Sequence, residues 1–258
     1  MATANSKTQP AAGWRRVTVF LIFVAGMIIA DEAQRKIFTA QVGAEFQQAQ
    51  SRYKADATNP TNVWQFARAA FNYAEFATSD AQRAALAEQG IAACRQLVAR
   101  DPKSAAAHYY LAMNLGQLAR TKFLGALKLV KEMDREFKKA GELDPQFDYA
   151  GPERNLGLLY RDAPGWPASI GNKRTARYYS EQAAKLVPDY PANHLNLVET
   201  YLLWNERDEA RHELQVLDAV WPAARTNLTG EAWEPSWDDW STRRDAARKK
   251  INETSSHP

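Results

Sequence analysis

Hydrophobic positions in this chain recur at helical spacing in blocks that are separated by polar turns. The clearest block has apolar residues on both sides of the polar stretch 205–208: Leu197, Tyr201, Leu214 and Leu217. Side chains three and four residues apart lie on one face of a helix, so each half of this block predicts an amphipathic helix. The block therefore predicts two antiparallel helices joined by a short turn.

Five prolines mark the blocks at intervals of 42, 43, 43 and 34 residues: Pro60, Pro102, Pro145, Pro188 and Pro222. We expect each proline to close a helix, because proline has no amide hydrogen to continue the helical ladder. A period of 20 to 50 residues is typical of solenoids, in which helix pairs stack to bury their apolar faces. The pattern predicts an all-α solenoid with about four repeats, at residues 60–102, 103–145, 146–188 and 189–222.

The order of bulky, small and aromatic positions within these blocks resembles the tetratricopeptide repeat. The third block shows it in Leu156-Gly157 and Tyr160 on its first helix and in Ala176 and Ala183 on its second. We expect Gly157 to let the paired helix approach closely. Extra residues at 121–130 and 162–172 lengthen the repeats beyond the standard unit.

The N-terminus carries an apolar run, VTVFLIFVAGMIIA at residues 17–30, after Arg15-Arg16 and before Asp31. Fourteen residues cover about 21 Å as a helix, less than the roughly 30 Å hydrocarbon core of a membrane. Residues 1–30 are therefore expected to be a signal peptide, and an uncleaved membrane anchor stays open as the alternative. Both interpretations predict export, to the periplasm or to the inner membrane through residues 17–30.

Two segments flank the expected repeats. Residues 31–59 have apolar positions at near-helical spacing and predict an amphipathic helix that caps the array or continues a membrane anchor. Residues 223–258 place Trp233, Trp237 and Trp240 before a basic helix and a polar tail. We expect this helix to fold onto the last repeat, with a partner-binding aromatic patch as the alternative. The basic residues at 243–250 are expected to form a solvated helix end.

Charge argues against nucleic acid as a partner. The chain has 33 basic and 30 acidic residues, and three of the basic ones, Lys7, Arg15 and Arg16, lie in the first 30 residues. The rest is neutral, whereas nucleic-acid binding depends on clustered excess basic charge. Contact with a membrane is expected only through the N-terminal segment.

The sequence offers no recognisable catalytic chemistry. Its single cysteine, Cys94, is expected to be a buried, inert thiol, and its four histidines match no metal-ligand spacing. No serine lies in a nucleophile motif, and residues 165–171 lack the order of a phosphate-binding loop. We therefore predict a non-enzyme with neither cofactor nor metal, and oligomerisation stays open.

The repeat register selects first-helix positions that face the concave side of such an array: Tyr109, Met113, Arg154, Leu158, Arg161, Leu195, Glu199 and Leu202. A largely apolar trough with a few charges suits a hydrophobic acid or an amphipathic partner segment, with Arg154 as the anion contact. Alternatively, Arg154 pairs with Glu199 and the apolar members belong to the core. Trp166, in the Pro- and Gly-rich stretch 163–172, is a second candidate binding residue, with a structural turn as its alternative.

Three longer runs resemble the T-component family of periplasmic TRAP transporters for organic anions, and more distantly the regulator-of-microtubule-dynamics repeat proteins. They are KFLGALKLVKEMDREFKKAGELDP at 122–145, GPERNLGLLYRDAPGWPASIGNKRTARYY at 151–179 and LVPDYPANHLNLVETYLL at 186–203. The resemblance, over residues 60–222, implies a periplasmic transport accessory that binds a small hydrophobic organic acid or a substrate-binding protein. The alternative is a protein-interaction scaffold for envelope assembly without a small-molecule ligand.

Overall fold

The computed structural model describes residues 32–122 and 125–253, so the expected leader at 1–30 and the last part of the expected tail lie outside it. The described residues form ten α-helices and one 3₁₀ helix, and the all-α prediction is confirmed. The elements are α1 (Glu32–Ala55), α2 (Pro60–Glu75), α3 (Asp80–Arg100), α4 (Ala105–Arg120), α5 (Ala126–Leu143), α6 (Phe147–Asp162), α7 (Lys173–Leu186), α8 (Pro191–Leu203), α9 (Arg207–Asn227), η1 (Glu231–Trp233) and α10 (Glu234–Glu253).

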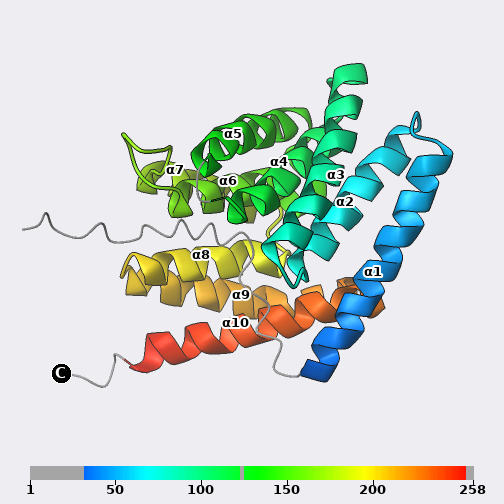
Figure 1. The fold of residues 1–258 in the computed structure, drawn as a ribbon. Helices are drawn as coiled ribbons and strands as arrows, with labels where there is room; N and C mark the ends of the chain where they lie inside the picture. The colour runs from blue at the N-terminus through cyan, green and yellow to red at the C-terminus, as the bar shows by residue number, and fades with distance from the viewer. Residues whose placement is uncertain (1–31, 123–124, 254–258) are drawn as a thin grey trace, which may run out of the picture.

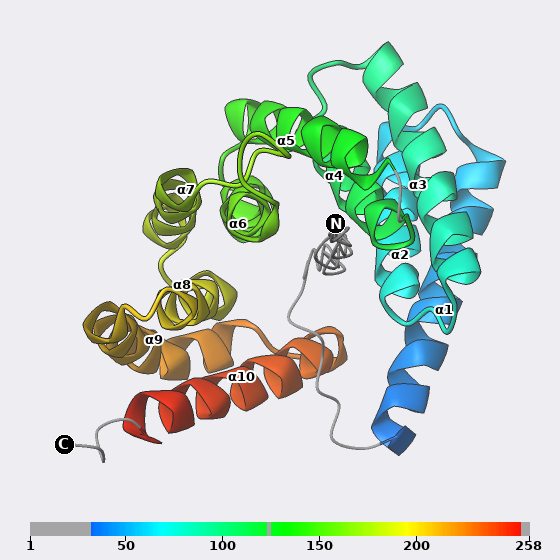
Figure 2. The ribbon, with the colours of Figure 1, turned by 60° about the vertical axis from the view of Figure 1, so that its left-hand side comes forward.

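Four helix pairs, α2–α3, α4–α5, α6–α7 and α8–α9, follow one another along an open arc (Figure 1). Figure 2 shows α2, α4, α6 and α8 on the inner side of this arc and α3, α5, α7 and α9 on the outer side. α1 packs on α2 at one end, and α10 packs on α8 and α9 at the other. Both ends of the repeat array are therefore covered by a further helix.

Side-chain caps explain where several helices begin. Asn59, Ser79, Ser104 and Asn172 each accept a hydrogen bond from a main-chain amide in the first turn of the helix that follows. Those amides have no partner within the helix, so a short polar side chain at this position stabilises the start by about 1 kcal/mol.

The prolines play three different roles, and the expectation that each closes a helix is wrong for two of them. Pro102, Pro145 and Pro188 lie just after the ends of α3, α5 and α7. Pro60 begins α2, where the missing amide hydrogen costs nothing. Pro222 lies inside α9, which continues to Asn227 because the last turns pack in the core through Ala224.

Close packing between paired helices depends on small residues. A methyl group on Gly157 in α6 would lie 2.3 Å from Ser180 Oγ and 3.0 Å from Ser180 N in α7. The expected close approach at Gly157 is confirmed. Cys94 in α3 is buried, as expected, and burial raises the pKa of its thiol well above the usual range.

The C-terminal helix is held by aromatic packing and by buried charge. Trp237 and Trp240 are buried in one core cluster with side chains of α8 and α9, so they do not form an exposed patch. Arg243 is also buried and donates to Glu199, Asn196 and Asp239. The expected solvated basic end is therefore wrong for the first part of 243–250, because these cations pair with acids on neighbouring turns and helices.

Within the part of the chain that the structure describes, no helix is both long enough and apolar enough to cross a membrane.

Candidate functional site

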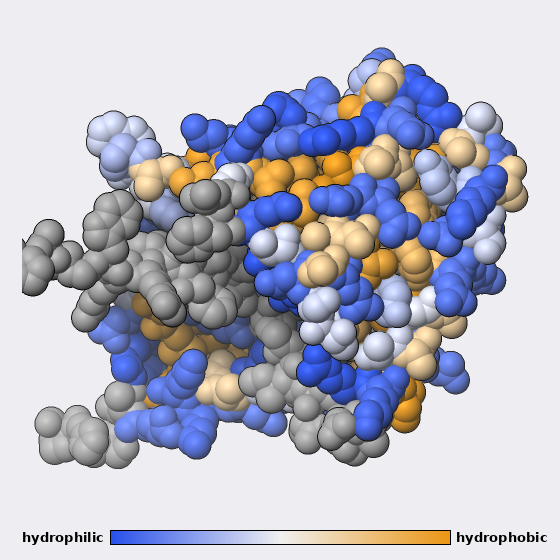
Figure 3. All heavy atoms as spheres, viewed as in Figure 1, coloured by the Kyte–Doolittle hydropathy of each residue, from blue (hydrophilic) through white to orange (hydrophobic). Residues whose placement is uncertain are grey.

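The inner helices α2, α4, α6 and α8 line the concave side of the arc, and we call this side the trough. Figure 3 shows hydrophobic side chains gathered over α4 and α6 and again near α8, among hydrophilic ones. Most residues of α4 and of α8 are buried, whereas the outer helices α7 and α9 bury only a single stripe each. A helix that is hydrophobic all round needs cover on every side. The inner helices α4 and α8 thus contribute most of their residues to the protein interior.

A left-handed turn lies at the start of the inner helix α6. Asp148, Tyr149 and Ala150 have φ values of 50°, 57° and 59°, although none of them is glycine. The left-handed conformation costs an L-residue roughly 1–2 kcal/mol. Three such residues in succession persist only where surrounding contacts hold them, and such strain often accompanies function.

Arg154 supplies those contacts. Its guanidinium donates to the main-chain oxygens of Tyr149 (2.8 Å) and Asp148 (3.1 Å). It also donates to Asp148 Oδ2 (3.1 Å) and to Asn193 Oδ1 on α8 (3.3 Å). Burial alone lowers the pKa of Arg154, but the acidic groups around it outweigh burial and raise this pKa above its already high ordinary value. Arg154 therefore serves the turn and joins the third repeat to the fourth.

Tyr109 completes the network from the second repeat. Its hydroxyl donates to Asp148 Oδ2 at 2.5 Å and accepts from Asn155 Nδ2 at 3.1 Å. Burial raises the pKa of this tyrosine well above its usual value, so it stays a neutral donor. Residues of three successive inner helices thus meet at Asp148 and Arg154.

An aromatic cluster adjoins the turn. Tyr149 stacks on Tyr190 with ring centroids 4.4 Å apart, and both rings meet Trp233 edge-on. The guanidinium of Arg154 lies over the Tyr190 ring, 5.1 Å from its centroid. Tyr149 remains 38% exposed and so presents an aromatic ring beside the trough.

The residues selected by the repeat register are mostly found inside the protein. Tyr109, Met113 and Leu195 belong to the core clusters, Leu202 packs against one of them, and Leu158 is buried. The charged members are paired: Arg161 with Asp162 and Thr200, and Glu199 with Arg243. The alternative pairing of Arg154 with Glu199 is therefore wrong, and Arg154 is already engaged at the position expected for an anion contact.

Trp166 stands apart from the trough. Its side chain is 89% exposed on the α6–α7 loop, which is closed by a hydrogen bond from Gly171 N to Pro164 O. The loop is ordered by its main chain while its largest side chain lies in water.

Two histidine–glutamate pairs recur at equivalent places in the repeats. His108 Nδ1 lies 2.6 Å from Glu136 Oε2, and His194 Nδ1 lies 2.5 Å from Glu213 Oε1. The Nε2 atom of each ring faces the carbonyl oxygen of the proline six residues earlier. Sequence reasoning missed these pairs, although the shared six-residue spacing from Pro102 and Pro188 was the available signal.

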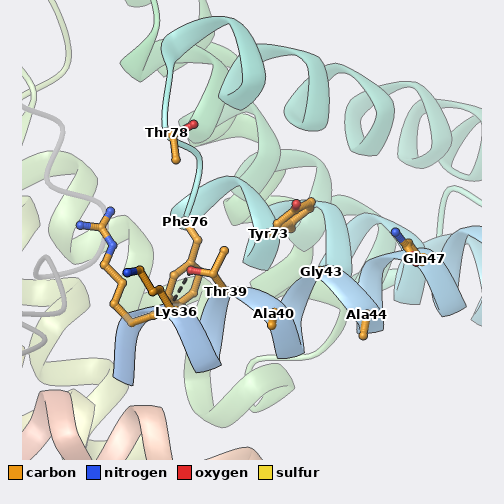
Figure 4. Close-up of a pocket in the computed structure, with 10 residues that line it drawn as sticks. Lys36, Thr39, Ala40, Gly43, Ala44, Gln47, Tyr73, Phe76 and Thr78 are labelled. Atoms are coloured by element: carbon orange, nitrogen blue, oxygen red, sulfur yellow. Dashed lines mark hydrogen bonds between the residues drawn. The ribbon is translucent and has the colours of Figure 1, made fainter. Parts of the chain in front are cut away.

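A separate groove lies between α1 and the end of α2, with a volume of about 910 Å³. Figure 4 shows Ala40, Gly43 and Ala44 along α1, with Tyr73 and Phe76 opposite them. It lies at the end of the array, away from the trough. A smaller hollow of about 410 Å³ adjoins the His108–Glu136 pair.

The described residues include no group of three or more histidine, cysteine or carboxylate side chains placed to hold a metal ion.

Comparison with known proteins agrees with the fold. The family model described as Regulator of microtubule dynamics protein 1-3 matches residues 30–150. The crystal structure of TTC0263, a thermophilic TPR protein of Thermus thermophilus, superposes with a TM-score of 0.60 at 19% identity, covering 85% of this chain and all of that one. No curated protein matches the sequence. The fold is a tetratricopeptide-like helical repeat.

These findings separate the two resemblances seen in the sequence. The resemblance to the regulator-of-microtubule-dynamics repeat proteins is supported by a family-model match, over residues 30–150. The resemblance to the TRAP T-component family stays a proposal.

Proposed function

We propose that this protein is a non-catalytic binding scaffold whose concave trough takes an apolar or amphipathic segment of a partner protein. The main observation behind this proposal is that the inner helices are lined by apolar side chains, while their charged side chains pair with other charged residues of the same chain. Concave surfaces of stacked helix pairs are the usual binding surfaces of solenoids. An amphipathic segment laid into such a groove buries its apolar face without needing a charged partner.

The exposed aromatic side chains support the same proposal. Tyr149 lies beside the trough and Trp166 projects from the α6–α7 loop. Aromatic residues are enriched at protein interfaces because they bury large apolar areas and retain polar edges. They would extend the contact beyond the trough itself.

The finer proposal, from the sequence resemblance, is a periplasmic accessory of a TRAP-type transporter. Of its two partners, a substrate-binding protein fits the trough better than a small hydrophobic acid. An acid needs an accessible cation, whereas Arg154 and Arg161 already bind carboxylates of this chain. Native mass spectrometry with hydrophobic organic acids checks this choice, and saturable binding of such an acid that Arg154→Lys weakens would favour the small-molecule alternative.

Site-specific photo-crosslinking tests the scaffold proposal. Benzoylphenylalanine replaces Leu202, a partly buried trough residue, or Gln215, an exposed residue of the outer helix α9. In envelope fractions we expect a defined protein adduct from position 202 that position 215 does not give. Identical adducts at the two positions would contradict binding in the trough.

A further inference from the structure

The groove between α1 and the end of α2 differs in charge from the other concave surfaces of the protein. Of the lining residues that the structure describes, Arg35 and Lys36 are cations and none is an acid. The smaller hollow beside His108 is lined by as many acids as lysines and arginines. A cleft lined by charge of one sign attracts a ligand of the opposite sign. The α1–α2 groove therefore favours an anion.

Arg35 is the accessible cation of this groove. Its side chain is exposed in the first turns of α1, and no carboxylate within the described side chains of 35–122 and 125–253 pairs with it. In the trough, by contrast, Arg154 binds Asp148 and Arg161 binds Asp162. An anion that reaches Arg35 therefore displaces no carboxylate of those segments.

The other polar groups of the groove are largely engaged within the chain. The Thr39 hydroxyl donates to the main-chain oxygen of Arg35 at 2.8 Å. The Thr78 hydroxyl donates to Gln82 Oε1 at 3.1 Å. Arg35 and Lys36 are thus the groups whose chemistry selects the ligand at this end.

The walls of the groove are apolar. Ala40, Gly43 and Ala44 lie along α1, and the rings of Tyr73 and Phe76 lie across from this helix at the end of α2 (Figure 4). A methyl group on Gly43 would lie 3.6 Å from the Tyr73 ring, so the two walls are about one van der Waals contact apart there. Small side chains facing aromatic rings suit an apolar body, since binding pockets are lined mostly by apolar groups with few polar ones.

The groove is elongated, with its charge at one end. The lining residues of α1 extend from position 35 to position 47, which is about 18 Å at 1.5 Å per residue. Both cations lie in the first two of these positions, and the neutral Gln47 lies at the far end. A matching ligand is therefore long and apolar, with its charge at one end only.

We propose that this groove binds an elongated apolar molecule that ends in a carboxylate. Arg35 binds the carboxylate, and the chain of the ligand lies along α1 under Tyr73 and Phe76. This site is separate from the trough of the proposed function and requires nothing of it. It gives a hydrophobic acid the accessible cation that Arg154 and Arg161 do not supply.

Photoaffinity labelling of the purified full-length chain tests the proposal. The probe is dodecanoate with a diazirine near its methyl end, used below the concentration at which it forms micelles. Trypsin releases the α1 wall as peptide 37–52 and the α2 wall as peptide 69–83, whereas most of α4 lies in peptide 104–120. We expect saturable labelling of peptides 37–52 and 69–83. Unlabelled dodecanoate should displace the probe, and the uncharged dodecanol should displace it poorly.

Two variants with matched controls locate the anion contact. Arg35→Gln removes the charge, so we expect labelling to weaken about tenfold through the loss of a hydrogen bond between charged groups. Arg174→Gln, at an exposed arginine of α7, should label as the parent does. Ala40→Glu places a negative charge in the groove and should weaken labelling, whereas Ala219→Glu on the exposed side of α9 should not. Circular dichroism checks that helix content is unchanged in each variant.

Three results would each overturn the proposal. They are equal displacement by dodecanol and dodecanoate, undiminished labelling of Arg35→Gln, and labelling of peptide 17–35 or 104–120 without the two groove peptides. Labelling of 104–120 alone would place the acid in the trough. The photo-crosslink at position 202 reports on a protein partner in the trough, so failure of either proposal leaves the other to its own test.

Discussion

Arg154 holds Asp148 through both its main chain and its side chain: Nη2 donates to the carbonyl oxygen and to Oδ2, each at 3.1 Å. The guanidinium is thus the element that keeps Asp148, Tyr149 and Ala150 in the left-handed conformation. Tyr109 binds the same carboxylate from the preceding repeat. The contacts of Asp148 with Arg154 and with Tyr109 therefore join the second repeat to the third.

Replacement of Arg154 distinguishes a structural from a ligand-binding role. Arg154→Ala removes the cation from the partly exposed Asp148 carboxylate and the donor from the turn, so we expect a loss of about 1.5–3 kcal/mol in the free energy of unfolding, measured by urea denaturation. The exposed Arg211, paired with an exposed Asp208, is the control and should cost under about 1 kcal/mol as alanine. A stable Arg154→Ala protein would contradict the structural role.

A glycine in the left-handed turn should change the free energy of unfolding in the opposite direction to Arg154→Ala, because it relieves backbone strain. Ala150 is buried with φ 59°, a conformation that glycine adopts without cost. We expect Ala150→Gly to keep or raise the free energy of unfolding, by up to about 1 kcal/mol. Ala176→Gly, at an equally buried position inside α7, should lower it by about 1 kcal/mol. Equal losses in the two variants, by thermal or urea unfolding, would argue against the strained turn.

The helices and the stacking order could be predicted from the sequence, because apolar spacing and small contact residues such as Gly157 are local signals. The turn at 148–150 could not, since a left-handed conformation in Asp, Tyr and Ala depends on Arg154 and on Tyr109, 39 residues before Asp148. The repeat register placed the trough residues on the inner helices. It could not show that Glu199 binds Arg243, because that contact depends on how α10 returns across α8.

The contact at Gly157 makes a further test of helix packing. A methyl group there meets the main chain of Ser180 as well as its hydroxyl, and the main chain cannot move aside. Overpacking of this kind costs about 1–3 kcal/mol, so Gly157→Ala should lower the midpoint of thermal unfolding. Gly43→Ala is the matched control: its methyl group would lie 3.6 Å from Tyr73, and it should raise the midpoint because alanine favours helix.

The histidine–glutamate pairs give stability that falls as pH rises. Hydrogen bonding to Glu136 raises the pKa of His108; burial alone lowers that of His194, but the bonds to Glu213 and Pro188 O outweigh it. Each histidine has a higher pKa in the folded protein than in the unfolded chain. The contribution of each pair to the free energy of unfolding is therefore fully present below the unfolded pKa of about 6.5 and is lost as the pH rises through the folded pKa.

We therefore expect the parent protein to lose stability between pH 6 and pH 9 by more than the double variant Glu136→Gln, Glu213→Gln, when urea unfolding is compared at both values. The exposed His212 serves as the control, because His212→Gln should follow the parent curve. If the double variant and the parent lose the same free energy, the two pairs do not supply the pH dependence.

Glu153 should also make the protein less stable as the pH rises, independently of the histidine–glutamate pairs. Burial raises the pKa of this carboxyl to about 7, and its Oε2 has no hydrogen-bond partner. The carboxyl ionises near pH 4.5 in the unfolded chain and near pH 7 in the folded protein, so stability falls between these values and the loss is complete above pH 7, whereas below about pH 4.5 the group is neutral in both states. Glu153→Gln keeps the shape without the charge. We expect this variant to be more stable than the parent at pH 8.5 and equal to it at pH 4.5 by urea unfolding; a variant less stable than the parent at pH 8.5 would mean that the ionised carboxylate is stabilising.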